Sequence, residues 1–325
     1  MPAVFFCSFQ SSFNKKAVNC RQKKRKERSK TMKKHIEATC LALVFLFTFY
    51  VAADTFLIKE SYQVIENSGS NTVTVKQTVT NSTTTDTSYE DDNISITINE
   101  YYENDTKIYV ADVTVKNTDL LKTAFAEGSY GKNITEKTSE IAESVGAILA
   151  INGDYYGVQE KGYVLKNGVI YRNTAVSGRE DLVIYENGSF EIINESDVTL
   201  EELKERGAYN VLSFGPGLVT CGNVSVTTNQ EVGRAMTSNP RTAIGIISQN
   251  HYVFVVSDGR TDESEGLSLY ELATFMQSLG CETAYNLDGG GSSTMYFAGQ
   301  VINNPTTNGN RISERSVSDI VYIGY

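Results

Sequence analysis

The residues best suited to chemistry lie in the tract Asn286–Met295, which reads NLDGGGSSTM. It places one carboxylate, Asp288, directly before three consecutive glycines and three hydroxyl side chains. Gly289, Gly290 and Gly291 would cost backbone entropy in a regular element, so we expect them to let the main chain approach a ligand whose oxygens accept its N–H groups. A tight turn alone needs only one or two glycines. The tract therefore predicts a binding or catalytic site.

Charged residues also follow other apolar, strand-like segments. Besides the glycine tract, three such strand ends are Asn152–Asp154, Asn239–Arg241 and Asp258–Arg260. Each is an ordinary turn sequence by itself, but a mixed sheet can present several strand ends to one cleft. Glu314 and Arg315 precede a further strand and add a carboxylate and a cation, for which a solvated salt bridge is the default interpretation.

The charged side chains at these strand ends predict the kind of ligand. Carboxylates such as Asp154, Asp258 and Asp288 suit reactions at the anomeric carbon of a sugar. The guanidinium groups of Arg241 and Arg260 suit a phosphate or carboxylate. Together they predict a ligand that combines a sugar or polyol ring with an anionic group.

Other residues with candidate chemistry leave alternatives open. Tyr155 and Tyr156 offer either an apolar platform for a sugar face or core packing. His251 begins a strand-like run, where a surface or strand-edge role is expected, so a Ser-His-Asp or Cys-His hydrolase is set aside. Cys221 and Cys281 form either one disulfide or two separate thiols.

The elements that must position these residues can be outlined from periodicity and turn chemistry. Alternating apolar residues predict strands at 94–98 and 108–115, and apolar runs predict strands at 147–151, 242–247, 251–256 and 282–287. Capping boxes predict helices that begin after Thr199 and Ser268, and a short helix is expected between 135 and 144. Asn-Gly pairs at 167–168 and 187–188 predict two hairpins of type I′. We expect an α+β fold, with a β-rich mixed sheet and a few helices in one domain over residues 94–325.

Charge divides the chain into a basic arm and an acidic body. Residues 1–54 carry 11 Lys+Arg against 3 Asp+Glu, which leaves 18 against 36 for the remainder. An acidic body should repel nucleic acid. The basic residues precede an apolar stretch, which predicts a signal peptide or signal anchor at 36–58 and an extracytoplasmic location for the residues after it, membrane-anchored or secreted. Residues 1–35 are either a basic cytoplasmic arm or contain a mis-assigned start, in which case translation begins at Met32 and residues 1–31 lie upstream of it. The polar residues 59–93 predict a linker.

Six motifs occur in an order that resembles a known family. The chain looks like a bacterial phosphodiester glycosidase, a relative of the catalytic domain of N-acetylglucosamine-1-phosphodiester α-N-acetylglucosaminidase, the uncovering enzyme. The resemblance covers roughly residues 94–325. The motifs that carry it are Asn152–Tyr156, Phe214–Leu218, Pro240–Gly245, Val256–Arg260, Asn286–Ser293 and Glu314–Asp319.

The resemblance implies hydrolysis of a sugar-1-phosphodiester to free sugar and a phosphomonoester, with a cell-wall or exopolysaccharide polymer as the expected source of substrate. A phosphodiesterase that cleaves P–O, or a non-catalytic glycan-binding module, remains an alternative. No cofactor is expected to be required, and assistance by a divalent cation is undecided. The expected catalytic residues are Asp288, Asp154 and Asp258; the expected substrate-binding residues are Asn152, Arg241, Arg260, Gly289, Gly290, Gly291, Ser292, Thr294 and Arg315.

Overall fold

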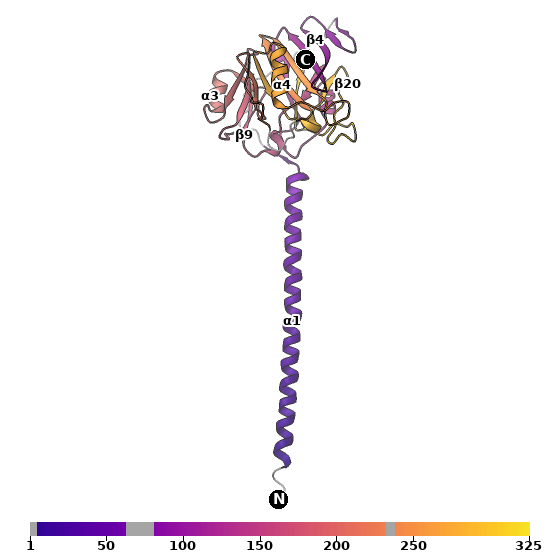
Figure 1. The fold of residues 1–325 in the computed structure, drawn as a ribbon. Coiled ribbons are helices and arrows are strands. Elements are labelled where there is room, and N and C mark those ends of the chain that lie inside the picture. The colour runs from indigo at the N-terminus through magenta and orange to yellow at the C-terminus, as the bar shows by residue number, and fades with distance from the viewer. Residues whose placement is uncertain (1–4, 63–80, 232–237) are drawn as a thin grey trace. The chain divides into compact units, whose positions relative to one another are not determined.

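A computed structural model describes residues 5–62, 81–231 and 238–325, which fall into two compact units, Met1–Ile58 and Lys59–Tyr325 (Figure 1). The first unit is the helix α1 (Phe5–Phe56). Among the described residues, one stretch of this helix, Lys30–Thr55, is long and apolar enough to cross a membrane. This agrees with the signal or anchor segment expected at 36–58.

Two large antiparallel sheets form most of the second unit. Because apolar residues alternate along some strands and run continuously along others, the sheets bury one face or both. Within the described residues, the five-stranded sheet has the order β20 (Gln300–Val301), β19 (Met295–Phe297), β8 (Leu149–Asn152), β21 (Asp319–Ile323) and β6 (Leu121–Phe125). The nine-stranded sheet has the order β15 (Asn223–Val224), β14 (Gly217–Thr220), β18 (Thr283–Asn286), β16 (Arg241–Ser248), β17 (His251–Ser257), β5 (Thr106–Val115), β4 (Ile94–Glu103), β3 (Ser88–Glu90) and β2 (Thr83–Thr84).

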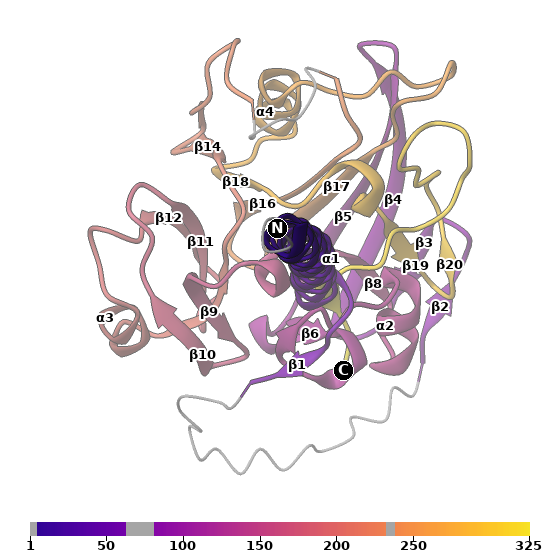
Figure 2. The ribbon, with the colours of Figure 1, turned by 90° about the horizontal axis from the view of Figure 1, so that it is seen from below.

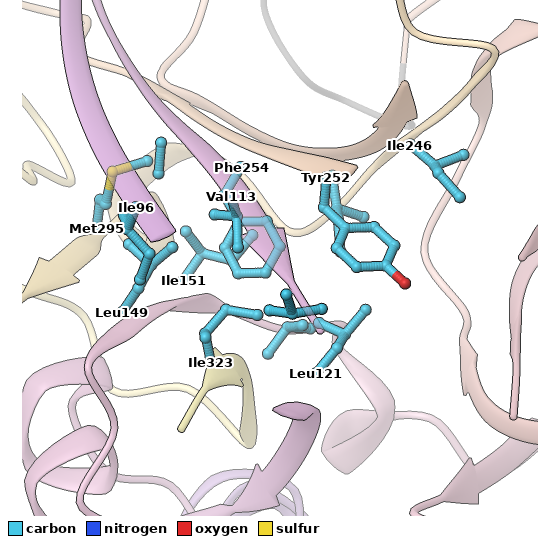
Figure 3. Close-up of a cluster of buried hydrophobic side chains, with 14 of the residues drawn as sticks. Ile96, Val113, Leu121, Leu149, Ile151, Ile246, Tyr252, Phe254, Met295 and Ile323 are labelled. Atoms are coloured by element: carbon cyan, nitrogen blue, oxygen red, sulfur yellow. The ribbon is translucent and has the colours of Figure 1, made fainter. Parts of the chain in front are cut away.

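The main core lies between these two sheets (Figure 3). Ile96, Val113 and Phe254 come from the nine-stranded sheet, while Ile151 and Ile323 come from the five-stranded sheet. Val253 and Val255 on β17 face the opposite side, so this strand is buried on both faces. That double burial explains the continuous apolar run at 251–256, and the α+β class is confirmed.

Short helices cover the outer faces of the sheets (Figure 2). Helix α4 (Leu269–Ser278) packs against β14, and α2 (Thr138–Ser144) packs against β8 and β21. Helix α3 (Leu200–Glu205) packs against a smaller sheet. That sheet contains β12 (Phe190–Asn194), β11 (Glu180–Tyr185) and β13 (Ala208–Leu212), and beside it lies the hairpin of β9 (Gly162–Lys166) and β10 (Val169–Thr174).

Local sequence signals agree with most element ends. Thr199 and Ser268 each accept a hydrogen bond from the backbone of the glutamate three residues later, so both capping boxes are confirmed. The hairpin at 167–168 has positive φ at both residues, as predicted. At the second hairpin only Gly188 has a positive φ, because the loop spans more than two residues and ends in a glycine bulge.

The linker expected at 59–93 differs from the structure at both ends. Strand β1 (Glu60–Ser61) pairs with β7 (Gly131–Lys132), and β2 and β3 extend the nine-stranded sheet. Tyr89 is buried, and its hydroxyl donates to Asp91 at 2.6 Å. One buried aromatic residue and Thr-rich edge strands are therefore enough to join this polar stretch to the sheet. The middle of the expected linker, residues 63–80, lies outside the described residues.

The two cysteines of the body are separate thiols, and His251 lies at the start of a strand. Cys221 is exposed, Cys281 is buried, and both are free thiols. Burial raises the pKa of Cys281 to about 12. His251 lies at the start of β17 with Nε2 2.8 Å from an Asp112 carboxylate oxygen, which is a partly exposed position on the sheet.

Candidate active site

The strand ends singled out in the sequence meet through their backbones. Asn152, fully buried at the end of β8, donates from Nδ2 to the carbonyl oxygen of Asp288 at 2.7 Å. Its Oδ1 accepts from Thr242 Oγ1 at 2.8 Å. Asn152 thus holds the ends of β8 and β18 against the start of β16, and both polar atoms of its side chain are bonded within the protein.

The glycine loop 289–291 is packed closely against its own chain. A Cβ atom on Gly289 would lie 2.9 Å from the carbonyl oxygen of Pro240, and one on Gly291 would lie 2.3 Å from Thr307 Oγ1. Gly290 has a φ of 63°, and its N–H donates to Pro240 O at 2.8 Å. The close approach that the glycines allow is therefore to neighbouring loops, and the Gly290 amide is already used.

Asp288 is the carboxylate at the centre of the exposed part of the site. Its Oδ2 accepts from Ser292 Oγ at 2.6 Å and from an Arg315 guanidinium nitrogen at 2.8 Å. Arg315 Nε also donates to Ser292 Oγ at 2.9 Å. The Asp288 side chain is 13% exposed and that of Arg315 is 41% exposed, so both groups can be reached from solvent.

Arg260 adds a second exposed cation near Arg315. One of its guanidinium nitrogens donates to Asn239 Oδ1 at 2.8 Å, and another contacts the carbonyl oxygen of Thr307. Burial, followed by the positive charge of Arg315, lowers the pKa of Arg260. The two guanidinium groups come from different loops and both lie beside the glycine loop 289–291, an arrangement suited to an anionic phosphodiester.

The environment of Asp288 acts on its ionisation in opposite directions. Burial raises its pKa above the ordinary value, while Arg315 and the Ser292 hydroxyl lower it in part. A carboxylate that is mostly withdrawn from water but still open on one side is a typical candidate for a catalytic base or nucleophile.

Asp154 occurs in a closed, buried network. Its Oδ2 accepts from Lys166 Nζ at 3.0 Å and from the Ser213 N–H at 3.0 Å. Lys166 also donates to Asp319 at 2.7 Å, and the side chains of the three charged residues are at most 2% exposed. Asp154 therefore supports the end of β8 from inside the protein and does not face solvent beside Asp288.

Burial and charge also act against each other in this network. Burial works against the charged form of Lys166, but Asp154 and Asp319 outweigh that effect and raise its pKa. Burial and the Asp154 charge raise the pKa of Asp319, against the opposing effect of Lys166.

Asp258 and Arg241 also form their hydrogen bonds and ion pairs with other residues of the chain. Asp258 accepts from the backbone N–H of Asn304 at 2.8 Å and from its side-chain amide at 3.0 Å, and so fixes the following loop. Arg241 donates from Nε to Leu267 O at 2.8 Å and pairs with Glu231 at 2.5 Å. Arg241 is only 3% exposed, and burial lowers its pKa. Both residues hold loops around the site.

Among the remaining expected residues, only Tyr155 is exposed. Ser292 and Thr294 are both fully buried: Ser292 donates to Asp288, and the Thr294 N–H donates to Asn152 Oδ1 at 3.3 Å. Tyr156 stacks on Tyr130 inside an aromatic cluster, so it has a core role. Tyr155 is 43% exposed and keeps the platform alternative open.

Sequence reasoning missed Lys166, Ser213, Asn303 and Asn304. Lys166 directly precedes an Asn-Gly turn, so the sequence indicates only that it belongs to a hairpin. Its ion-pair partners, Asp154 and Asp319, lie outside that hairpin. Asn303 donates to Asp258 and to the Ser293 carbonyl, a link between loops that no local pattern indicates.

Among the described residues, no group of three or more His, Cys, Asp or Glu side chains is arranged to hold a metal ion.

Comparison with known proteins places this geometry in a family. The family model described as phosphodiester glycosidase matches residues 145–324, more than half of the chain. The chain belongs to the phosphodiester glycosidase family. The matched range contains Asp288, Ser292, Arg260 and Arg315, and the family and fold support a hydrolase of this kind.

Curated relatives share only part of their length with this chain. The SPbeta prophage-derived protein YomE of Bacillus subtilis is 29% identical over 241 residues, which cover 67% of this chain and 36% of YomE. The N-acetylglucosamine-1-phosphodiester alpha-N-acetylglucosaminidase of Mus musculus is 38% identical over 66 residues, which cover 20% of this chain and 13% of the mouse protein.

A solved structure supports the fold of this chain. The catalytic domain of zebrafish N-acetylglucosamine-1-phosphodiester alpha-N-acetylglucosaminidase, auto-inhibited by its pro-peptide, superimposes with a TM-score of 0.57. The match covers 82% of this chain and 88% of the zebrafish chain at 18% identity.

Proposed function

We propose that this phosphodiester glycosidase hydrolyses a glycosyl 1-phosphodiester, of the N-acetylglucosamine type, at the C–O bond. The observation that carries the proposal is the group formed by Asp288, Ser292 and Arg315, with Arg260 beside it. It offers one partly exposed carboxylate and two exposed guanidinium groups. These are the groups needed at a sugar C1 that is linked to phosphate.

The leaving group explains why one open carboxylate is sufficient. An ordinary glycosidase needs a second carboxyl group to protonate the departing alkoxide. A phosphate monoester has a second pKa of about 6, so it departs without a strong acid when cations stabilise its charge. In this proposal Arg315 and Arg260 bind the phosphate, and Asp288 either attacks C1 or activates the water that does so.

We further propose that this reaction takes place outside the cytoplasm. Basic residues precede the apolar stretch Lys30–Thr55 of α1, which is the charge arrangement that keeps the preceding arm in the cytoplasm. The acidic body would then meet glycosyl phosphates of a cell-wall or exopolysaccharide polymer. Cleavage of P–O by the same arginines is the competing reaction, and binding without turnover is the other alternative.

A product assay tests the proposal on the full-length chain in detergent. We expect free N-acetylglucosamine from the methyl diester of its α-1-phosphate, with loss of turnover in Asp288→Asn. Asp197→Asn is the matched control because Asp197 is exposed and lies in a turn before α3. Sugar phosphate as the product would indicate P–O cleavage. Ligand binding without any product would indicate a binding module.

A further inference from the structure

The structure contains a cavity of about 480 Å³ that is lined in part by the loop leading to Arg315. Its lining includes Tyr102, Lys107, Asp258, Glu263, Asn304 and Ile312. Tyr102 is 64% exposed and Ile312 is 52% exposed, so apolar surface faces solvent here. The volume lies within the range of about 300–1,000 Å³ that is usual for small-molecule sites.

The walls of this cavity are held by hydrogen bonds before any ligand arrives. At the β4–β5 turn, Thr106 Oγ1 donates to the Gly266 carbonyl at 3.0 Å, and the Lys107 N–H donates to Ser264 Oγ at 2.9 Å. Elsewhere in the lining, Asp258 accepts a hydrogen bond from the backbone N–H of Asn304. A cavity built in this way loses little conformational entropy when a ligand binds.

Tyr102 differs from its neighbour Tyr101 in what it contacts. Successive residues of β4 point to opposite faces of the strand. The Tyr101 ring packs edge-on against Phe275, with 5.4 Å between the ring centroids. Tyr102 instead lines the cavity, beside the exposed side chain of Glu263. An exposed aromatic face next to a carboxylate and the Asn304 amide group suits a sugar ring, which presents both apolar C–H faces and hydroxyl groups.

The loop from Asn303 to Arg315 connects this cavity to the candidate active site. Asn304 and Ile312 line the cavity, the Thr307 carbonyl contacts Arg260, and Arg315 pairs with Asp288. A substrate whose phosphate lies at Arg260 and Arg315 would thus have one end directed along this loop.

We propose that the Tyr102 cavity binds a neutral sugar ring on the acceptor side of the phosphodiester. This inference rests on the proposed function for the position of the phosphate. Charge favours a neutral occupant, because Glu263 and the acidic body oppose a further anion, and Lys107 is already paired with Glu100 at 2.8 Å. The two arginines remain the place for the negative charge.

The test compares two diesters of α-N-acetylglucosamine 1-phosphate, one with methanol and one with the 6-hydroxyl of methyl glucoside, on the full-length chain. We expect Tyr102→Ala to lower kcat/KM about tenfold for the glucoside diester. For the methyl diester, kcat/KM should stay within about twofold. Tyr102→Phe, which keeps the ring, and Tyr270→Ala, an exposed tyrosine on α4, should behave like the unchanged protein with both diesters. Equal effects of Tyr102→Ala on both diesters, or no effect on either, would overturn the inference.

A binding experiment tests this inference separately from the proposed function. If neither diester is hydrolysed, saturation-transfer NMR with maltotriose and chitotriose decides the question. A signal from the unchanged protein that is lost in Tyr102→Ala supports the sugar subsite, even though the proposed reaction fails. No signal from either oligosaccharide overturns it.

Discussion

Asp288, Asp154 and Asp258 have the same side chain and similar positions after strands, but their surroundings give them different roles. Asp154 is buried against Lys166, and Asp258 binds the amide groups of Asn304. Asp288 alone among these three is partly open to solvent, with Arg315 beside it. The burial and the bonding partners of a carboxylate, and not the motif in which it occurs, therefore decide whether a substrate can reach it.

Arg315 is expected to control the pH at which Asp288 becomes active. Burial raises the pKa of Asp288 and Arg315 lowers it, so Arg315→Ala should raise the pKa further. Because the ionised carboxylate is the active form, the acid limb of the kcat/KM profile should move to higher pH. We also expect a loss of about 10²-fold at the optimum, from the missing phosphate contact.

A pH series of kcat/KM checks this expectation. Arg311→Ala is the matched control, since Arg311 is exposed on the same loop. An acid limb that stays in place in Arg315→Ala would show that Asp288 does not control the ionisation seen in the profile.

Sequence reasoning predicted which loops meet better than it predicted where their side chains point. Several charged residues at strand ends do lie on loops that meet, because the end of β8 in one sheet packs against the end of β18 and the start of β16 in the other. The direction of each side chain was not predictable, since it depends on partners such as Lys166 and Asn304 that are distant in the sequence. The family motifs likewise mark positions and do not distinguish an exposed Asp288 from a buried Asp154.

At the scale of elements, buried charges fix the strand end that carries Asn152 and Asp154. Lys166, on β9, reaches Asp154 after β8 and Asp319 on β21. This arrangement joins a hairpin to the five-stranded sheet. We therefore expect the network to contribute to the fold of the site, without contact with substrate.

Lys166→Met should destabilise the body strongly. It leaves Asp154 and Asp319 buried without their cation, and breaking a buried pair in this way costs about 3–5 kcal/mol. Urea unfolding of the full-length chain measures the change in the free energy of unfolding. Lys116→Met, at an exposed lysine, is the control. A loss below about 1 kcal/mol would mean that water or a rearranged pair replaces Lys166.

The close packing of the glycine loop predicts that an added methyl group at Gly291 lowers activity. Gly291→Ala should push against Thr307, whose carbonyl contacts Arg260, and so displace that guanidinium group. We expect kcat/KM to fall by about 10-fold to 10²-fold, because small misplacements at a site are costly. Adding Thr307→Ala removes the nearest clashing atom, Thr307 Oγ1, and should restore part of the activity. If the double variant is no better than Gly291→Ala, the steric explanation fails.

Local elements were more predictable than their pairing. Capping boxes and the Asn167-Gly168 turn carry their information within a few residues, so the sequence predicts them well. The pairing of β8 with β19 and β21 joins segments more than a hundred residues apart, and no local pattern indicates it. The strand at Tyr89 was missed because one aromatic residue in a Thr-rich stretch is a weak signal.

At the scale of the molecule, the chain combines an apolar N-terminal helix with an acidic body of two packed sheets. The charge difference between the two parts agrees with a basic arm on the cytoplasmic side and a body on the other side of a membrane. An external site would give the body access to polymers that a cytoplasmic enzyme does not meet.

Cys221 provides a test of this location. It is exposed on the body, whereas Cys281 is buried and Cys40 lies in the apolar stretch of α1. A membrane-impermeant maleimide should therefore label intact cells that express the chain, and Cys221→Ser should remove the signal. The assay uses a chain in which Cys7 and Cys20 are replaced by serine, so that the basic arm gives no signal. Labelling of Cys221 only in permeabilised cells would then place the body in the cytoplasm.

Hydrolysis in oxygen-18 water tests the central claim most directly. The full-length chain is incubated with the methyl diester of α-N-acetylglucosamine 1-phosphate, and the products are weighed by mass spectrometry, with Asp288→Asn in parallel. Attack at C1 predicts heavy oxygen in the free sugar, none in the phosphate, and no product from the variant. Heavy oxygen in the phosphate, or full turnover by Asp288→Asn, would contradict the proposed role of the Asp288 carboxylate.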